Sequence, residues 1–405
     1  ANFLGAGMVA DAFVVAFRLP NLFRRLFAEG AFAAAFVPLF ARELEAGDGA
    51  GAEARAAAQA RARIFADEAM TLLALVLVAF VAVMELIMPW AMVVLAGGFE
   101  AVPGKMEMVT ELSRIAFPYL LFISLVSLQS GILNSLGQFP AAAAAPVLLN
   151  LCLIAALLGL TGHVETPGHA LAWGVFAAGV AQFAWLAWFC RRQGFPLRLV
   201  RPRWTEKVAV LIKRILPVVF GASLYQVNLL IGTILATYVS DGAVSYLYYA
   251  DRVTQLPLGV VGVAVGTALL PLLARQLKAG EDRAAQNSQN RGLEFALLLT
   301  LPAAAACLVI PDEIIRVLFE RGAFGAEATA ATASALFAYA TGLPAYVLVR
   351  VLAPGFYARE DTSTPVRIAI AAMVVNIVLM LALMKPMGHV GIALAASASA
   401  WLNTL

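Results

Sequence analysis

Charged side chains are scarce in this sequence of 405 residues. Only 13% of the residues are Asp, Glu, Lys or Arg, whereas 62% are hydrophobic. Soluble domains contain about 25% charged and roughly 45–50% apolar residues, so this chain has too few polar side chains to cover a surface that faces water. The composition excludes a soluble globular protein and predicts a protein whose solvent is a lipid bilayer.

Cysteine and histidine are rarer still, with 3 of each. The cysteines lie far apart in the chain, in a spacing that fits neither a disulfide framework nor a metal-binding motif. His163, His169 and His389 fall near predicted loops, and no acidic cluster accompanies them in the sequence. We therefore expect no metal site and no cofactor.

Catalytic motifs are also missing from the sequence. It contains no paired carboxylates, no nucleophile–base set and no nucleotide-binding loop. Aspartate is too sparse in the apolar segments to form the metal-binding clusters that a membrane enzyme acting on polyprenyl phosphates requires. We expect no catalytic residues.

Long apolar runs dominate the chain instead. With their flanking residues, these runs approach the ~20 residues that span a hydrocarbon core. An all-α polytopic membrane protein of about twelve spans is predicted, the first truncated and reduced to a remnant near residues 1–5. Helices are expected at residues 8–42, 67–96, 109–136, 141–161, 168–190, 212–239, 243–277, 290–310, 329–356, 365–384 and 389–405.

Arginine and lysine concentrate in three segments between these helices, at residues 42–63, 191–214 and 275–291. The alternate connections are poorer in positive charge, so the positive-inside rule places the basic segments in the cytoplasm. They are short and flank membrane spans, which argues against nucleic acid as a partner.

The sequence also repeats itself. Residues 38–47, PLFARELEAG, match residues 271–280, PLLARQLKAG. A weaker echo pairs Gly131, Pro140 and Asn150 with Gly355, Pro365 and Asn376. Chance similarity in an apolar chain is the alternative explanation. An even number of helices between the matching elements makes the repeats parallel, an arrangement that builds transporters with a central site between two halves.

The repeat predicts two lobes of six helices around a central cavity. We expect an N-lobe at residues 1–190 (helices 1–6, the first truncated), a basic cytoplasmic linker at residues 191–211 and a C-lobe at residues 212–405 (helices 7–12).

Ionisable residues interrupt several apolar segments, where they are costly and mostly functional. Asp11, Arg18 and Arg25 are spaced by seven and share one face of a straight helix, and Glu29 follows Arg25 by four residues, within reach of an ion pair. Arg24 interrupts the same segment.

A second group of polar residues begins at Asp251 and Arg252. Gln255 and three glycines follow Arg252 at steps of three or four residues, a stripe that suits either close helix packing or a cavity wall. Arg350 interrupts a third span.

These arginines allow two interpretations. They are structural if Arg25 pairs with Glu29 and Arg252 with Asp251, or if they snorkel to the interface. They are functional if they line a cationic cavity, because the planar guanidinium donates two parallel hydrogen bonds to phosphate. A transporter of cations would instead place uncompensated acids at this depth.

Several motifs resemble one known family. Residues 11–13 (DAF), 18–32 (RLPNLFRRLFAEGAF) and 36–38 (FVP) closely resemble the signature of the MurJ family, also called MviN, and residues 248–252 (YYADR) and 352–357 (LAPGFY) match it again. Members are lipid II flippases of bacterial peptidoglycan synthesis, within the multidrug/oligosaccharidyl-lipid/polysaccharide exporter superfamily. The family fold is two six-helix lobes around a central cavity, followed by two more helices, fourteen in an intact member.

The resemblance implies roles for individual residues. It places Arg24 and Arg252 on the essential cavity arginines of the family, and it favours Arg24 where the spacing alone favours Arg25. The expected substrate-binding residues are Arg24, Arg252, Arg25 and Arg18, the supporting residues are Asp11, Glu29, Asp251 and Gln255, and Arg350 is a further intramembrane charge.

The sequence departs from the family in two respects. The family's other cavity arginines, in its first helix, and its last two helices are expected to lie outside this chain. Some members bind sodium through acids in two helices of the second lobe, where this chain has Asn228, Gly232 and Asn376 but no acid in mid-span. The resemblance therefore does not extend to a sodium site.

The resemblance implies a multi-pass protein of the bacterial inner membrane that moves lipid II to the periplasmic leaflet by alternating access. Its expected partners are lipid II, membrane lipids and other cell-wall synthesis proteins. The rival hypotheses are a flippase for another undecaprenyl-linked oligosaccharide, a multidrug antiporter of the same superfamily and a membrane scaffold.

Overall fold

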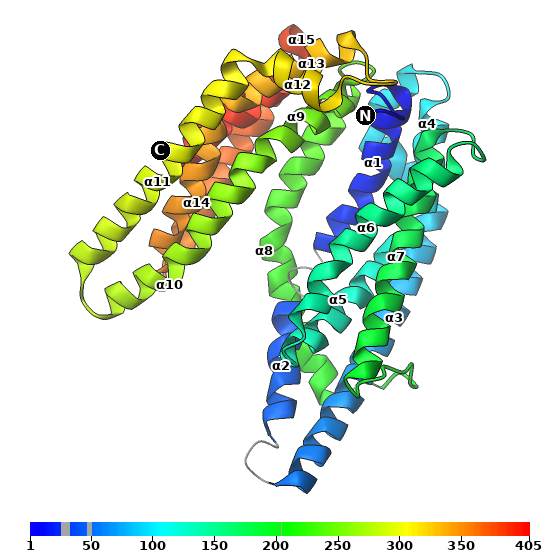
Figure 1. Ribbon diagram of the computed structural model, residues 1–405, viewed down its shortest axis with the longest axis vertical. Helices are drawn as coiled ribbons and strands as arrows, with labels where there is room; N and C mark the ends of the chain where they lie inside the picture. The colour runs from blue at the N-terminus through cyan, green and yellow to red at the C-terminus, as the bar shows by residue number, and fades with distance from the viewer. Residues whose placement is uncertain (26–32, 47–50, 204) are drawn as a thin grey trace. The chain divides into compact units, whose positions relative to one another are not determined.

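Helices make up nearly all of the described chain (Figure 1). The structure, a computed structural model, describes residues 1–25, 33–46, 51–203 and 205–405. Within these ranges there is no strand, and a single isolated bridge joins Arg321 to Phe324. The prediction of an all-α protein is confirmed.

The chain divides into two compact units, and α1 (Met8–Phe23) contributes residues to both. The first unit consists of Ala1–Val14, Ala96–Val102 and Asn228–Leu405, and the second of Val15–Leu95 and Pro103–Val227. The lobe boundaries expected from the repeat stay a prediction.

The second unit is a bundle of long helices around an aromatic core. Phe36 stacks on Phe40 and on Phe65, with ring centroids 5.5 and 5.4 Å apart, and all three side chains are buried. After α1, its helices are α2 (Ala33–Glu45), α3 (Ala52–Ala96), α4 (Lys105–Ala116), α5 (Tyr119–Ser135), α6 (Phe139–Leu160), α7 (Pro167–Arg192) and the first part of α8 (Glu206–Thr237).

Helix α3 is longer than expected. It has 45 residues and begins at Ala52, whereas the sequence placed a helix at residues 67–96 and a connection at 42–63. Residues 52–63 are rich in alanine and arginine, which are strong helix formers. Because ~20 residues span a bilayer, this basic part of α3 is a helical extension of the span.

The basic connection between α7 and α8 is anchored along α3. The Asp67 Oδ1 atom accepts a hydrogen bond of 2.8 Å from the Arg198 backbone N–H, and the Thr71 Oγ1 atom accepts one of 2.9 Å from the Val200 N–H. Two side chains one helical turn apart on α3 thus bind alternate residues of the extended connection.

The first unit contains the remaining helices. α10 and α11 form an antiparallel pair joined by a short turn within the expected basic segment 275–291 (Figure 1). Its elements after α8 are α9 (Ala243–Pro257), the π-helical turn η3 (Leu258–Val263), α10 (Ala264–Lys278), α11 (Asp282–Val309), α12 (Pro311–Phe319), α13 (Ala326–Ala340), α14 (Leu343–Tyr357) and α15 (Ser363–Thr404).

Two expected helices are interrupted, and two others are joined into one. The span predicted at 243–277 changes to a π-helical turn directly after Pro257, because proline removes a helix hydrogen bond. The helix predicted at 329–356 is the pair α13 and α14, bent by 41°. The two helices predicted at 365–384 and 389–405 are the two parts of α15, which breaks at Gly388 (φ 61°, ψ −138°).

One expected connection is a helix. Residues 311–321 contain α12, which begins at a proline and carries Asp312 and Glu313 in its first turn. Proline has no N–H to leave unsatisfied at that position, and acidic side chains favour the positive end of the helix dipole.

The described helices confirm a multi-pass membrane protein. Seven of them are long and apolar enough to cross a membrane, or up to eight if α13 and α14 form one bent span. The prediction of twelve spans also included the segment 8–42, and residues 26–32 of this segment lie outside the described ranges. It also counted the two parts of α15 as separate spans.

The internal repeat occupies equivalent places in two helices. Pro38 lies inside α2 and Pro271 inside α10. The helices end at Glu45 and Lys278, which are matching positions of the repeated sequence. This agreement supports a duplicated origin over chance similarity.

Candidate functional site

A buried carboxylate meets the beginning of α9. Asp11 is fully buried, its Oδ2 accepts a hydrogen bond of 2.8 Å from the Gly242 N–H, and its Oδ1 accepts bonds from the Ser245 N–H (2.8 Å) and the Ser245 Oγ–H (2.6 Å). The first N–H groups of a helix have no partner within the helix and carry the positive end of its dipole. Asp11 therefore caps α9.

The backbone and the packing at this cap constrain Gly242 and Ser245. Gly242 has φ +84°, a left-handed conformation that disfavours other residues, and a Cβ atom added there would collide with the Tyr246 ring. Ser245 is fully buried and was not among the residues expected from the sequence. Its signal was a serine in the first turn of a helix that follows a glycine, although the sequence did not reveal that Asp11 is its partner.

Helix α9 presents a polar face one turn further on. The Arg252 Nη2 atom donates a hydrogen bond of 3.0 Å to the Tyr248 hydroxyl, and the guanidinium lies 4.7 Å from the centroid of the Tyr248 ring. The cation–π contact orients the guanidinium, and the Arg252 side chain remains exposed.

The neighbouring acid has a different partner. Gln255 Nε2 donates a hydrogen bond of 3.3 Å to Asp251 Oδ1. Arg252 binds Tyr248 and Asp251 binds Gln255, so the buried Arg252–Asp251 ion pair of the structural interpretation is not what the structure contains. An exposed, oriented arginine is well suited to bind an anion.

The arginines of the first segment lie at the end of α1. Phe23 packs edge-on against Phe80 and Phe117, with centroids 4.9 and 6.1 Å apart, and these contacts position the end of the helix. Arg24 follows directly and is partly buried, while Arg25 is exposed.

The first segment also contains Arg18 and Glu29. Arg18 is partly buried on α1. Glu29 lies outside the described residues. Arg24 and Arg252 belong to different compact units, so their action on one ligand stays a prediction.

The glycine stripe after Gln255 serves helix packing at two of its three positions. A Cβ atom added to Gly262 would lie 2.9 Å from the Arg350 Cδ atom, and one added to Gly266 would lie 2.9 Å from the Arg350 carbonyl oxygen. No described atom lies within 4 Å of a Cβ atom added to Gly259. The stripe therefore packs closely on α14 at Arg350, whose side chain is itself exposed, and is open at its first glycine.

Gly266→Ala is expected to lower the thermal stability of the protein. The added methyl group meets backbone, which shifts less easily than a side chain, and such overpacking costs about 1–3 kcal/mol. Gly259→Ala, the matched control, has open space and is expected to be neutral. Thermal unfolding of the two purified variants tests this difference, and equal melting temperatures would contradict the close packing.

Two asparagines pair where the sequence lacks an acid in mid-span. Asn376 Nδ2 donates a hydrogen bond of 2.9 Å to Asn228 Oδ1, between α15 and α8. The Asn376 Oδ1 atom is buried and has no hydrogen-bond partner among the described residues, and the pair brings no negative charge.

The expectation that no acidic residues accompany the histidines is wrong for His169. Glu111 on α4 and Glu165 just before α7 approach it, and the potential ligand atoms of the three lie within 4.8 Å of one another. Glu165 precedes His169 by four residues, but Glu111 is distant in sequence, so spacing alone did not reveal the cluster of three.

Known proteins agree with this architecture. A family model described as "Lipid II flippase MurJ" matches residues 1–405. A probable lipid II flippase MurJ of Rhizobium tropici is 47% identical over 411 residues, which cover 99% of this chain and 74% of the relative. Its counterpart from Haemophilus influenzae is 38% identical, covering 100% of this chain and 79% of the relative.

Solved structures show the same fold. A lipid II flippase MurJ in an inward closed conformation matches with a TM-score of 0.83 at 23% identity, covering 100% of this chain and 81% of that one. An inward-facing multidrug transporter of the MATE family matches with a TM-score of 0.70 at 14% identity, covering 98% and 91%. The model match along the whole chain and the identity to the curated relatives establish that this chain belongs to the MurJ family of lipid II flippases.

Proposed function

We propose that this protein translocates lipid II, the undecaprenyl-pyrophosphate-linked peptidoglycan precursor, from the cytoplasmic to the periplasmic leaflet of the bacterial inner membrane. The observation that carries the proposal is the family match along all 405 residues. The oriented arginine on α9 supports it, because a pyrophosphate needs cationic donors at membrane depth.

Arg24 and Arg252 bind the pyrophosphate in this proposal. Each guanidinium donates paired hydrogen bonds to phosphate oxygens, a geometry that lysine lacks. Arg25 and Arg18 add positive charge in this proposal. Tyr248 orients Arg252, and the supporting roles expected for Glu29, Asp251 and Gln255 stay predictions. Asp11 holds the start of α9, the helix that carries Arg252.

The transport cycle follows from the duplicated architecture. We propose that an N-lobe of residues 1–190 and a C-lobe of residues 212–405, joined by the basic segment 191–211, rock about the axis of the repeat. The isoprenoid tail stays in lipid during this motion. The proposed partners are lipid II, membrane lipids and other cell-wall synthesis proteins.

The orientation of the chain is testable by cysteine labelling. We expect a cysteine at Arg201, in the basic connection, to be shielded from membrane-impermeant reagents in intact cells, and a cysteine at Gly162 to react. Arg201 is exposed, and a Cβ atom added to Gly162 would have open space around it out to 4 Å, so neither substitution disturbs packing.

The labelling background is a protein without its three native cysteines. Labelling of both sites after cell lysis controls for access. Reaction of the Arg201 site from outside intact cells would overturn the orientation.

Depletion of the protein in its own cells tests the proposed function. Lipid II is expected to accumulate in the cytoplasmic leaflet, where an impermeant enzyme that cleaves exposed lipid II does not reach it. Re-expression of the full-length protein should restore cleavage. Unchanged cleavage in depleted cells would contradict a flippase role, and selective loss of another undecaprenyl-linked glycan from the outer leaflet would indicate the rival substrate.

A further inference from the structure

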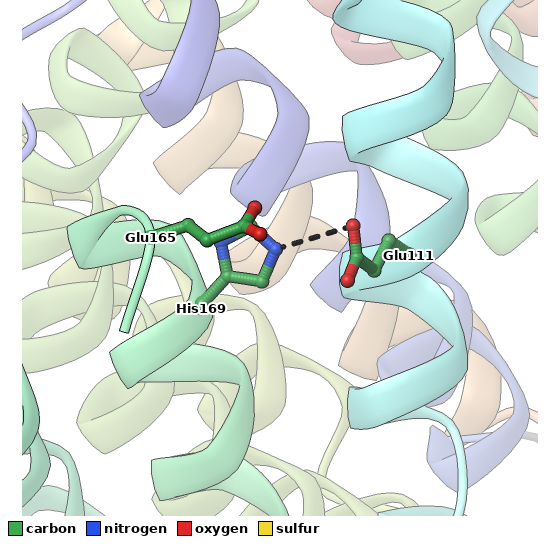
Figure 2. Close-up of side chains that lie close together, drawn as sticks. All are labelled: Glu111, Glu165 and His169. Carbon is green, nitrogen blue, oxygen red and sulfur yellow. Dashed lines mark ion pairs between the residues drawn. The ribbon is translucent and has the colours of Figure 1, made fainter. Parts of the chain in front are cut away.

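Three potential metal ligands meet at one end of the second unit (Figure 2). Glu111 extends from α4, and Glu165 and His169 come from the turn before α7 and from its first turn. Figure 2 shows the three side chains pointing toward one another, with the two carboxylates beside the imidazole ring. Glu111 and Glu165 are exposed, whereas His169 is only 6% exposed.

A contact at the Nδ1 atom holds the imidazole ring of His169 in place. Thr166, the N-cap of α7, accepts a hydrogen bond of 3.4 Å from the His169 backbone N–H, and its Oγ1 lies 2.8 Å from His169 Nδ1. When Nδ1–H donates to this oxygen, Nε2 carries the lone pair. Metal-binding histidines use such an outer partner to fix the ring and its tautomer.

The Nε2 atom of His169 has the surroundings of a ligand atom. It is buried, and in the described part of the chain it makes no hydrogen bond. It points toward Glu111 Oε2 at 3.5 Å, which exceeds the usual hydrogen-bond range of about 2.7–3.2 Å. Two donors that each lie about 2.0–2.1 Å from a tetrahedral zinc ion are themselves roughly 3.4 Å apart.

We propose that Glu111, Glu165 and His169 bind a zinc ion, with water as the fourth ligand. Imidazole nitrogen together with carboxylate oxygen suits zinc, whereas magnesium and calcium prefer oxygen alone. The start of α7 carries the positive end of the helix dipole, which disfavours a cation. The two carboxylates oppose that dipole and neutralise the ion.

The ion fastens α4 to the start of α7. The residues that precede His169 form the connection between α6 and α7, one of the connections that the charge distribution places outside the cytoplasm. The site thus faces the compartment opposite to the basic segments, and it stabilises one end of the unit without contributing to the transport residues.

Zinc binding to the purified full-length protein tests this proposal. After chelation with EDTA, added zinc should bind at one saturable site and raise the melting temperature. His169→Gln, Glu111→Gln and Glu165→Gln should each weaken binding at least tenfold, because losing even an outer-shell partner costs ten- to a hundredfold, and should remove the thermal shift. Magnesium should produce no comparable shift.

Two matched controls separate the site from nonspecific binding. His163→Gln removes an exposed histidine of the same connection, and Glu107→Gln removes an exposed acid one turn before Glu111 on α4; both should bind zinc as the wild type does. Loss of binding only in the three site variants supports the proposal. Absence of saturable binding, or equal binding in the His169→Gln variant, overturns it and leaves only a close contact between His169 and Glu111.

Discussion

Replacing Arg24 or Arg252 with alanine is expected to abolish or cripple lipid II transport while the protein still inserts into the membrane. A charge-assisted hydrogen bond contributes roughly 1.5–3 kcal/mol. Losing one therefore weakens lipid II binding about tenfold to a hundredfold. Arg24→Lys should fall between wild type and alanine, because lysine retains the charge but lacks the planar fork. Binding of lipid II and thermal stability are to be measured on the same variants.

Arg192→Ala is a matched control for Arg252→Ala. Arg192 lies over the Trp188 ring at 4.6 Å, as Arg252 lies over Tyr248 at 4.7 Å. Both variants lose an exposed arginine and a cation–π contact, but only Arg252 is proposed to touch the substrate. If Arg252 were structural instead, alanine would lower thermal stability and leave lipid II binding unchanged.

Asp11→Ala is expected to have the largest effect on stability. It leaves the Gly242 N–H, the Ser245 N–H and the Ser245 hydroxyl without their buried acceptor. Leaving one buried donor without an acceptor costs about 1–3 kcal/mol. The free energy of unfolding should therefore fall by about 3 kcal/mol or more. Transport should fall with it, because α9 carries Arg252.

Ser245→Ala provides the graded comparison. It removes only the hydrogen bond from the hydroxyl and leaves both backbone N–H groups bonded to the carboxylate. The free energy of unfolding is therefore expected to fall by about 1 kcal/mol. Thermal or denaturant unfolding of both variants in the same detergent measures the difference. An Asp11→Ala protein as stable as the Ser245→Ala protein would contradict the capping role.

Sequence patterns identified the charged residues but not most of their partners. Asp11 stood out because an acid in an apolar segment is costly. Its donors Gly242 and Ser245 lie 231 and 234 residues away, and one sequence carries no record of that contact. Glu111 and His169 were missed for the same reason.

The glycines after Arg252 show the same limit at shorter range. Steps of three and four residues indicated a shared helix face, which left close packing and a cavity wall equally open. Only the position of Arg350 on α14 distinguishes Gly266, which packs against its backbone, from Gly259, which is open.

Helix existence was easier to predict than helix ends. Apolar runs located the spans, since the bilayer sets their length. The early start of α3 and the presence of α12 depended on helix propensity and proline at a helix start in polar segments, where hydrophobicity gives no signal.

Transport by the purified full-length protein in lipid vesicles tests the central claim most directly. Fluorescent lipid II in the inner leaflet is protected from an impermeant quencher, and the protein is predicted to expose this pool. Arg252→Ala should leave it protected, and Arg192→Ala should expose it as the wild type does. Protection of lipid II equal to that in protein-free vesicles would contradict this function. Movement of a cationic drug or of another undecaprenyl-linked glycan faster than that of lipid II would contradict it as well.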